Sequence, residues 1–140
     1  MTSIRPLKKY KEINLIQSNT KEPNERYDGV KRFCHDYGYE CGCFKSMAGM
    51  PVKRGCVYLT PEDNVIVDIM QSAHRQNLQA GEDFGLISYN ERRLNEILCD
   101  GLTTLSTDFV KMGEIVVELI NSNEIRTVRN PCKMIIRNTL

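Results

Sequence analysis

Short apolar runs alternate along this chain with longer stretches in which apolar residues recur every three or four positions. Runs of four to eight apolar or β-branched residues suit a buried strand, and the longer spacing suits one face of a helix. The runs predict strands at residues 13–17, 39–44, 56–60, 84–88, 102–106 and 132–136. The periodic stretches predict helices at residues 24–37, 62–77, 91–98 and from 109 to about 120.

This alternation predicts an α/β fold. Parallel strands need a crossover between them, and right-handed crossovers cover both faces of the sheet with helices. We therefore expect a three-layer, flavodoxin-like domain whose sheet is mostly parallel. The connection at residues 45–54 contains glycine and proline and is too short for a crossover helix, so its path stays open.

One predicted helix has both a start signal and an unusually broad apolar surface. Thr60, Pro61 and Asp63 suit the N-cap, the first turn and the third position of the helix at residues 62–77. Its apolar residues extend over more than one stripe, which is typical of a helix that contacts something besides its own sheet. They include Val65, Ile66, Ile69 and Met70.

Length and charge limit the class of protein. A chain of 140 residues suits one compact domain, for which we expect a polar tether at residues 1–10 and the folded unit at 11–140. The formal net charge of +1 and scattered basic residues argue against direct contact with a nucleic-acid backbone. The sequence contains neither a run long enough to span a membrane nor the apolar core of a signal peptide, so we expect a cytoplasmic protein.

Little in the sequence suggests catalysis or metal binding. Phosphate-binding glycine loops and a nucleophile elbow are absent. Cys34 and His35, followed by Cys41 and Cys43, offer possible zinc ligands, but paired zinc spacings are missing, and we expect reduced thiols and no metal or cofactor. Glu62 and Asp63 follow a strand and suit helix capping; a Mg²⁺-dependent phosphoacceptor site is the alternative use of this pair.

A longer pattern resembles a known family. The segment GEDFGLISYNERRLNEILCDGLTTLSTDFVKMGEIVVELI and the ending NPCKMIIRNTL closely resemble the effector domain of bacterial transcriptional regulators of the lactose-repressor type. The likeness is strongest to the subgroup joined to a GntR-type winged helix. It is carried by Gly81, Asp83, Phe84, Ile87, Ser88, Tyr89 and Asn90, then Leu102, Thr103, Thr104 and Leu105, then Met112 and Gly113.

The resemblance implies a periplasmic-binding-protein-like fold of type I, of which this chain would be the C-terminal subdomain. Such domains hold a small sugar or related polyol between two lobes and control DNA binding by a separate winged-helix domain, which this chain lacks. The resemblance also implies a homodimer, with the broad face of the helix at 62–77 as the expected interface: Val65, Ile66, Ile69 and Met70. It implies a binding protein and not an enzyme.

Ligand contacts follow from positions that match the family motif. Asn90 matches the residue that bonds sugar hydroxyls, although it could also cap the helix at 91–98. Glu62 and Asp63 match the family's polar pair with an offset of one residue. Asn24 stands where the family often has a sugar-clamping arginine, which weakens the case for a hexose. Arg26 fits a second, more structural arginine, and Tyr89 could supply an aromatic platform.

Three other functions remain open from sequence alone. A small flavodoxin-like enzyme or phosphoacceptor would use Glu62 and Asp63 beside a nucleophile. An exported sugar-binding protein shares the same bilobed fold. An interaction module with an unused pocket is the third, because this architecture serves many functions.

Overall fold

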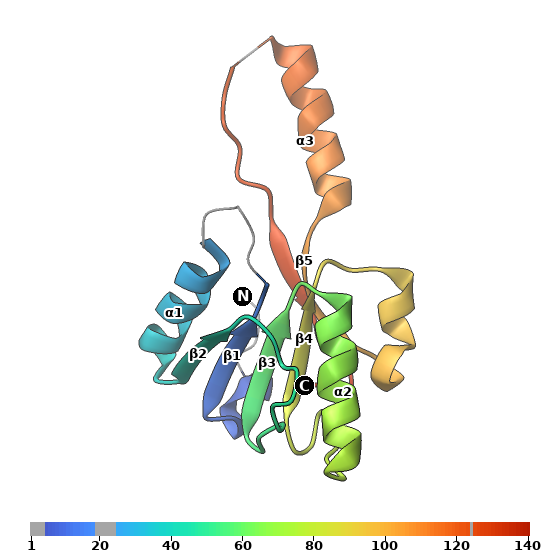
Figure 1. Cartoon of the computed structure of the whole chain (residues 1–140). Coiled ribbons are helices and arrows are strands. Elements are labelled where there is room, and N and C mark those ends of the chain that lie inside the picture. Colours follow the sequence, from blue (N-terminus) through green and yellow to red (C-terminus); the bar gives the residue numbers. More distant parts are fainter. Residues whose placement is uncertain (1–4, 19–24, 124) are drawn as a thin grey trace.

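A computed structural model of the chain describes residues 5–18, 25–123 and 125–140. Its centre is a six-stranded sheet in the order β2-β1-β3-β4-β5-β6 (Figure 1). The strands are β1 (Glu12–Ile16), β2 (Glu40–Phe44), β3 (Cys56–Thr60), β4 (Gly85–Tyr89), β5 (Thr103–Thr107) and β6 (Cys132–Ile135). The helices are α1 (Glu25–Tyr37), α2 (Asp63–Arg75) and α3 (Phe109–Ser122), with the short 3₁₀ helices η1 (Arg5–Lys9), η2 (Arg93–Glu96) and η3 (Leu98–Asp100).

Strands β1 to β5 are parallel, and only the edge strand β6 runs antiparallel to its neighbour. The predicted α/β class and mostly parallel sheet are confirmed. Strand β3 shows why the apolar runs predicted them so well, since all five of its residues are buried. A strand buried on both faces needs a continuous apolar sequence, unlike a strand with one face in water.

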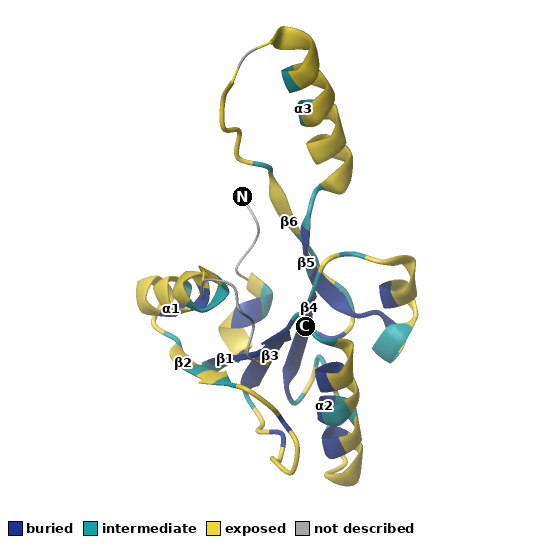
Figure 2. Ribbon diagram, turned by 45° about the horizontal axis from the view of Figure 1, so that its top comes forward, coloured by how far each residue is buried: buried dark blue, intermediate teal, exposed yellow. Residues whose placement is uncertain are grey.

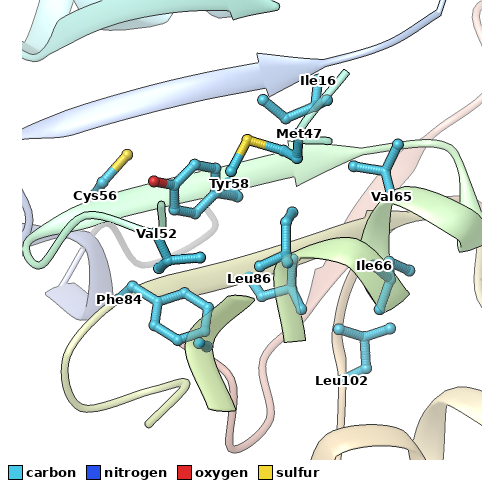
Figure 3. Close-up of a cluster of buried hydrophobic side chains, with 12 residues drawn as sticks. Ile16, Met47, Val52, Cys56, Tyr58, Val65, Ile66, Phe84, Leu86 and Leu102 are labelled. Carbon is cyan, nitrogen blue, oxygen red and sulfur yellow. The ribbon is translucent and has the colours of Figure 1, made fainter. Parts of the chain in front are cut away.

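Two apolar layers cover the sheet. On the face that carries α2, the larger cluster includes Ile69 together with Tyr58, Phe84 and Leu86, which are labelled in Figure 3. On the opposite face, beside α1, the smaller cluster is built on Leu15, Val30, Cys34, Leu59 and Ile87. The helices therefore lie on both faces, as the sequence predicts, because successive residues of each strand point to opposite sides.

The loop between β2 and β3 covers part of the sheet, as a crossover helix would. Met47 and Val52 are buried in the α2-face cluster. The Ser72 hydroxyl of α2 donates to the Met50 carbonyl at 3.0 Å, which ties this loop to the helix. A loop with two inserted apolar side chains thus covers this part of the sheet.

Three local predictions are wrong. Residues 5–10 are not a simple tether, because Leu7 and Tyr10 are buried in the α1-face cluster. Strand β3 ends at Thr60 as predicted, but the N-cap residue of α2 is Glu62, so Thr60 is not the N-cap and Pro61 is not in the first turn. The Thr60 hydroxyl instead accepts a hydrogen bond from the backbone N–H of Glu62 at 3.1 Å.

The predicted helix at residues 91–98 is replaced by η2 and η3. Cys99 and Asp100 both have positive φ angles, so no regular α-helix can continue past Leu98. The fully buried side chain in this segment is the polar Asn95, whose amide donates to the Asn90 carbonyl at 3.2 Å. The apolar side chain of Ile97 points to solvent, so the segment never presents an apolar stripe to the sheet.

The proposed dimer face on α2 is used inside the chain. Val65, Ile66 and Ile69 are buried, and Met70 packs partly buried against the same cluster. A side chain that is fully covered by its own sheet has no surface to offer a second copy. Burial of Val65, Ile66 and Ile69 within the chain contradicts their predicted place in an interface between copies, whereas Met70 is only partly buried.

Helix α3 leaves the carboxyl end of β5 and projects away from the sheet (Figure 1). It begins at an N-cap, since the Asp108 side chain accepts a hydrogen bond from the Lys111 N–H. All its residues are described and none is buried, so the apolar stripe of Phe109, Met112, Val116 and Ile120 faces solvent (Figure 2). Neither α3 nor any other described helix is long and apolar enough to cross a membrane.

Because one face of α2 is buried, substitutions at two nearby apolar residues of this helix should have very different effects on stability. Ile69→Ala should lower the free energy of unfolding by about 2–5 kcal/mol, because it leaves a cavity in a packed core. Val67→Ala, at a side chain that is 51% exposed, should change it by less than about 0.5 kcal/mol. Urea unfolding followed by circular dichroism measures both, and equal effects would contradict the packing described for α2.

Candidate functional site

The carboxyl ends of the parallel strands meet at one edge of the sheet, where open α/β sheets bind ligands. Ser18 follows β1, Glu62 follows β3 and Asn90 follows β4 at this edge. The backbone N–H of Ser18 donates to the Glu62 carboxylate at 2.5 Å, so the first two connections are joined. The structure thus brings the sequence-predicted residues Glu62 and Asn90 to the same edge.

Asn90 is held in a left-handed turn with its side chain exposed. Its φ is +62°, a conformation that asparagine tolerates better than most residues. Its backbone N–H donates to the Leu105 carbonyl at 3.0 Å, which fixes the turn against β5. Its side-chain amide makes no hydrogen bond to the described residues, and the N-cap of η2 is Arg92. The helix-capping role for Asn90 is therefore wrong, and the amide remains available to a ligand.

The carboxylates of Glu62 and Asp63 have different surroundings. Glu62 is half-buried and is the N-cap residue of α2, but its side chain makes no capping bond to the helix. Asp63 is exposed and accepts two hydrogen bonds from the Arg92 guanidinium, one of them at 2.9 Å. A ligand could bond the free oxygen sites of Glu62 directly, whereas it would compete with Arg92 for Asp63.

Tyr89 and Arg26 lie on the other side of the same edge. The Arg26 guanidinium is 5.5 Å from the centre of the Tyr89 ring, a cation–π contact. Burial raises the pKa of Tyr89, and the positive charge of Arg26 opposes that rise. The tyrosine therefore packs toward α1 and does not stack beside Asn90. The sixth predicted residue, Asn24, lies outside the described residues.

A cavity of about 420 Å³ lies between α1 and the sheet. Its lining is apolar apart from Glu25 and Arg26 at the start of α1, and it includes Leu7, Val30, Phe33, Ile87, Tyr89, Leu105 and Met134. Such a lining suits apolar groups and offers few partners for the hydroxyls of a polyol. We therefore assign the candidate polar site to the edge near Asn90 and not to this cavity.

Sequence reasoning missed the ion pair that follows Asn90. The Glu91 carboxylate meets the Arg137 guanidinium in two contacts, at 2.7 and 3.1 Å. The Thr104 hydroxyl also donates to this carboxylate. The hydrogen bonds from Arg137 lower the pKa of Glu91. No motif spacing links two residues so far apart in the chain, and only the fold brings them together.

The cysteines form no disulfide in the part of the chain that the structure describes. Cys34 and Cys56 are buried, and burial raises the pKa of each thiol to about 12. Cys41, Cys43 and Cys132 are exposed. Within residues 5–18, 25–123 and 125–140, no three His, Cys, Asp or Glu side chains gather closely enough to hold a metal ion.

Several solved structures with similar folds are bacterial transcription regulators. A LacI-family regulator from Bifidobacterium animalis matches 97% of this chain and 58% of its own length, with 16% identity and a TM-score of 0.72. A LacI-family regulator from Arthrobacter, in complex with lactose, matches 94% of this chain and 57% of its own, with 15% identity and a TM-score of 0.69. A sugar-binding LacI-family regulator from Escherichia coli, in complex with phosphate, matches 94% and 55%, with 17% identity and a TM-score of 0.67.

This chain thus spans a little more than half the length of the structures it matches. A search of curated proteins finds no significant match. The model of the periplasmic binding protein-like domain matches residues 8–140, which is nearly all of the sequence. The mostly parallel sheet of this chain and the polar groups at its carboxyl edge agree with this match. The chain therefore belongs to the family of periplasmic binding protein-like domains.

Proposed function

We propose that this chain is one lobe of the ligand-sensing domain of a bacterial transcriptional regulator, and that it binds a small sugar or related polyol. The observation that carries the proposal is the exposed Asn90 amide at the carboxyl end of β4, at the same edge of the sheet as the half-buried Glu62 carboxylate. An amide and a carboxylate together can donate to and accept from vicinal hydroxyls. Relatives of the same fold include one solved with lactose and one solved with phosphate.

A second lobe is part of this proposal. Helix α3 stands beyond the carboxyl edge, where a ligand would lie, and its apolar side chains are uncovered. Apolar side chains spaced along one helix are usually covered in a folded protein. A further lobe facing the carboxyl edge of the sheet would cover α3 and enclose the ligand. Closure of the two lobes on a ligand would then change their relative angle.

The regulatory part of the proposal rests on the family resemblance. A separate winged-helix domain would bind DNA, the protein would act in the cytoplasm as a homodimer, and the ligand would bias the arrangement of the two DNA-binding domains. The interface would have to use surfaces other than the buried face of α2.

Two contacts count against the alternative of an enzyme or phosphoacceptor that uses Glu62 and Asp63. Asp63 already accepts two hydrogen bonds from Arg92, and Glu62 accepts one from Ser18. A Mg²⁺ site would need both carboxylates to face one point with further oxygen ligands. A binding role fits these surroundings better than a catalytic one.

A thermal-shift screen of the full-length protein tests the proposal. Pentoses, 6-deoxyhexoses, hexoses, lactose and sugar phosphates should be compared, and a ligand at 100 times its dissociation constant should stabilise the fold by about 2.7 kcal/mol, which is several degrees in Tm. Asn90→Gly should keep the turn, because glycine accepts a positive φ without strain, but should remove most of the ligand-induced shift.

The variant Asn90→Ala serves as the matched control for the backbone. It also removes the amide, but it adds strain of about 1–2 kcal/mol in the left-handed conformation. Both variants should lose the response to ligand while only Asn90→Ala lowers the Tm without ligand. The proposal would fail if no sugar raised the Tm, or if Asn90→Gly responded as strongly as the unchanged protein.

A further inference from the structure

The residue after Asn90 is tied to the C-terminal end of the chain. The Glu91 carboxylate and the Arg137 guanidinium form a two-point ion pair at 2.7 and 3.1 Å. Their side chains are only 23% and 19% exposed, so water screens this pair less than a fully exposed one. Arg137 also donates to the Leu102 carbonyl at 2.8 Å, which links the pair to the start of β5.

Strand β5 holds Glu91 at two further points. The Ser106 hydroxyl accepts a hydrogen bond from the Glu91 backbone N–H at 2.9 Å. The Thr104 hydroxyl donates to the Glu91 carboxylate. Asn90 itself bonds β5 only through its backbone N–H. The contacts of Glu91 therefore fix the position of the end of the turn relative to β5.

The C-terminal tail is a firm anchor for Arg137. Thr139 is fully buried between β4 and β5, where its hydroxyl donates to the Leu86 carbonyl and accepts from the Thr103 N–H, both at 2.8 Å. The Thr139 carbonyl in turn accepts from the Leu86 N–H at 2.8 Å. Gly81 lies so close to the tail that a side chain there would meet the Asn138 carbonyl oxygen at 1.9 Å.

We infer that Glu91 and Arg137 are positioning residues for the ligand site: their two-point contact fixes the turn that presents the Asn90 amide. The inference rests on the proposed function for the role of Asn90, although the contact itself does not. A guanidinium holds both carboxylate oxygens in one plane, which a lysine ammonium cannot do. Arg137 therefore sets the direction of the turn as well as supplying a charge.

Acid should release this pair. Hydrogen bonds from Arg137 and Thr104 lower the pKa of Glu91, and burial opposes them; Lys133 adds a favourable charge, and Glu96 faces Arg137. A group whose pKa is lowered by folding stabilises the fold above its unfolded pKa, which is about 4.3 for glutamate, and that stabilisation is lost as the pH falls through the folded pKa. As the pH falls below the unfolded pKa of about 4.3, exchange at residues 90 and 91 should therefore speed up more in the unchanged chain than in Glu91→Gln, after correction for the intrinsic pH dependence.

Hydrogen exchange of the 140-residue chain, read by NMR without any ligand, tests the inference. Arg137→Lys and Arg137→Gln should speed exchange of the amide protons of Asn90 and Glu91 about tenfold more than exchange of those of Leu15 and Val57 in the central strands. Arg54→Gln is the matched control, since it removes an ion pair between an exposed guanidinium and the largely buried Asp83 carboxylate, at the opposite end of β4 from Asn90. It should leave Asn90 unchanged.

The inference is overturned if Arg137→Gln leaves Asn90 unchanged, or if every amide speeds up equally, which would indicate a role in overall stability alone. Lactose then serves as the first ligand probe on the full-length protein, where Arg137→Lys should weaken binding about tenfold more than its change in Tm accounts for. Unchanged binding despite faster exchange would also overturn the positioning role. If lactose and the other sugars bind no form of the protein while Asn90 exchange still responds, the sugar proposal fails and the turn-fixing contact stands.

Discussion

Burial of β3 on both faces is the constraint on which the rest of the structure depends. Its five residues have no exposed side, so two separate apolar layers must cover it. Tyr58 packs under α2 and Leu59 packs under α1, because neighbouring residues of a strand point to opposite faces. The parallel pairing of β3 with β1 and β4 then sends their carboxyl ends to one edge. The position of the polar site follows from that pairing.

Much of this arrangement could be predicted from the order of apolar runs. Strand β3 was visible because a strand buried on both faces reads as an uninterrupted apolar run. The helix at residues 91–98 could not be excluded in the same way, since Leu94, Ile97 and Leu98 have helical spacing although the first two face solvent. The deciding residues were Asn95, which is buried although it is polar and donates one hydrogen bond to the Asn90 carbonyl, and Cys99, whose backbone is left-handed. The spacing of apolar residues indicates neither the burial of a polar side chain nor a left-handed backbone.

The location of the site could be predicted from the sequence, but only some of its side-chain contacts could. A residue that ends a parallel strand must lie at the carboxyl edge, and this located Asn90 and Glu62. The sequence could not reveal that Arg92 would donate hydrogen bonds to Asp63, or that Arg137 would form an ion pair with Glu91. Those pairings depend on the fold. The broad apolar face of α2 misled for a related reason. Its breadth reflects contacts with the sheet and with Met47 and Val52 of the preceding loop, which occupy the surface assigned to a second copy.

Because α3 projects away from the sheet, its thermal unfolding should be independent of the rest of the fold. A helix that buries no side chain gains nothing from the cooperative packing that holds the sheet together. Helices shorter than roughly 12–15 residues are marginal in water by themselves, and α3 has 14. In the 140-residue chain, the coil–helix equilibrium of α3 is therefore set by its own sequence and its Asp108 cap. Its ellipticity should decline gradually with temperature, well before the single sharp transition in which the sheet, α1 and α2 unfold together.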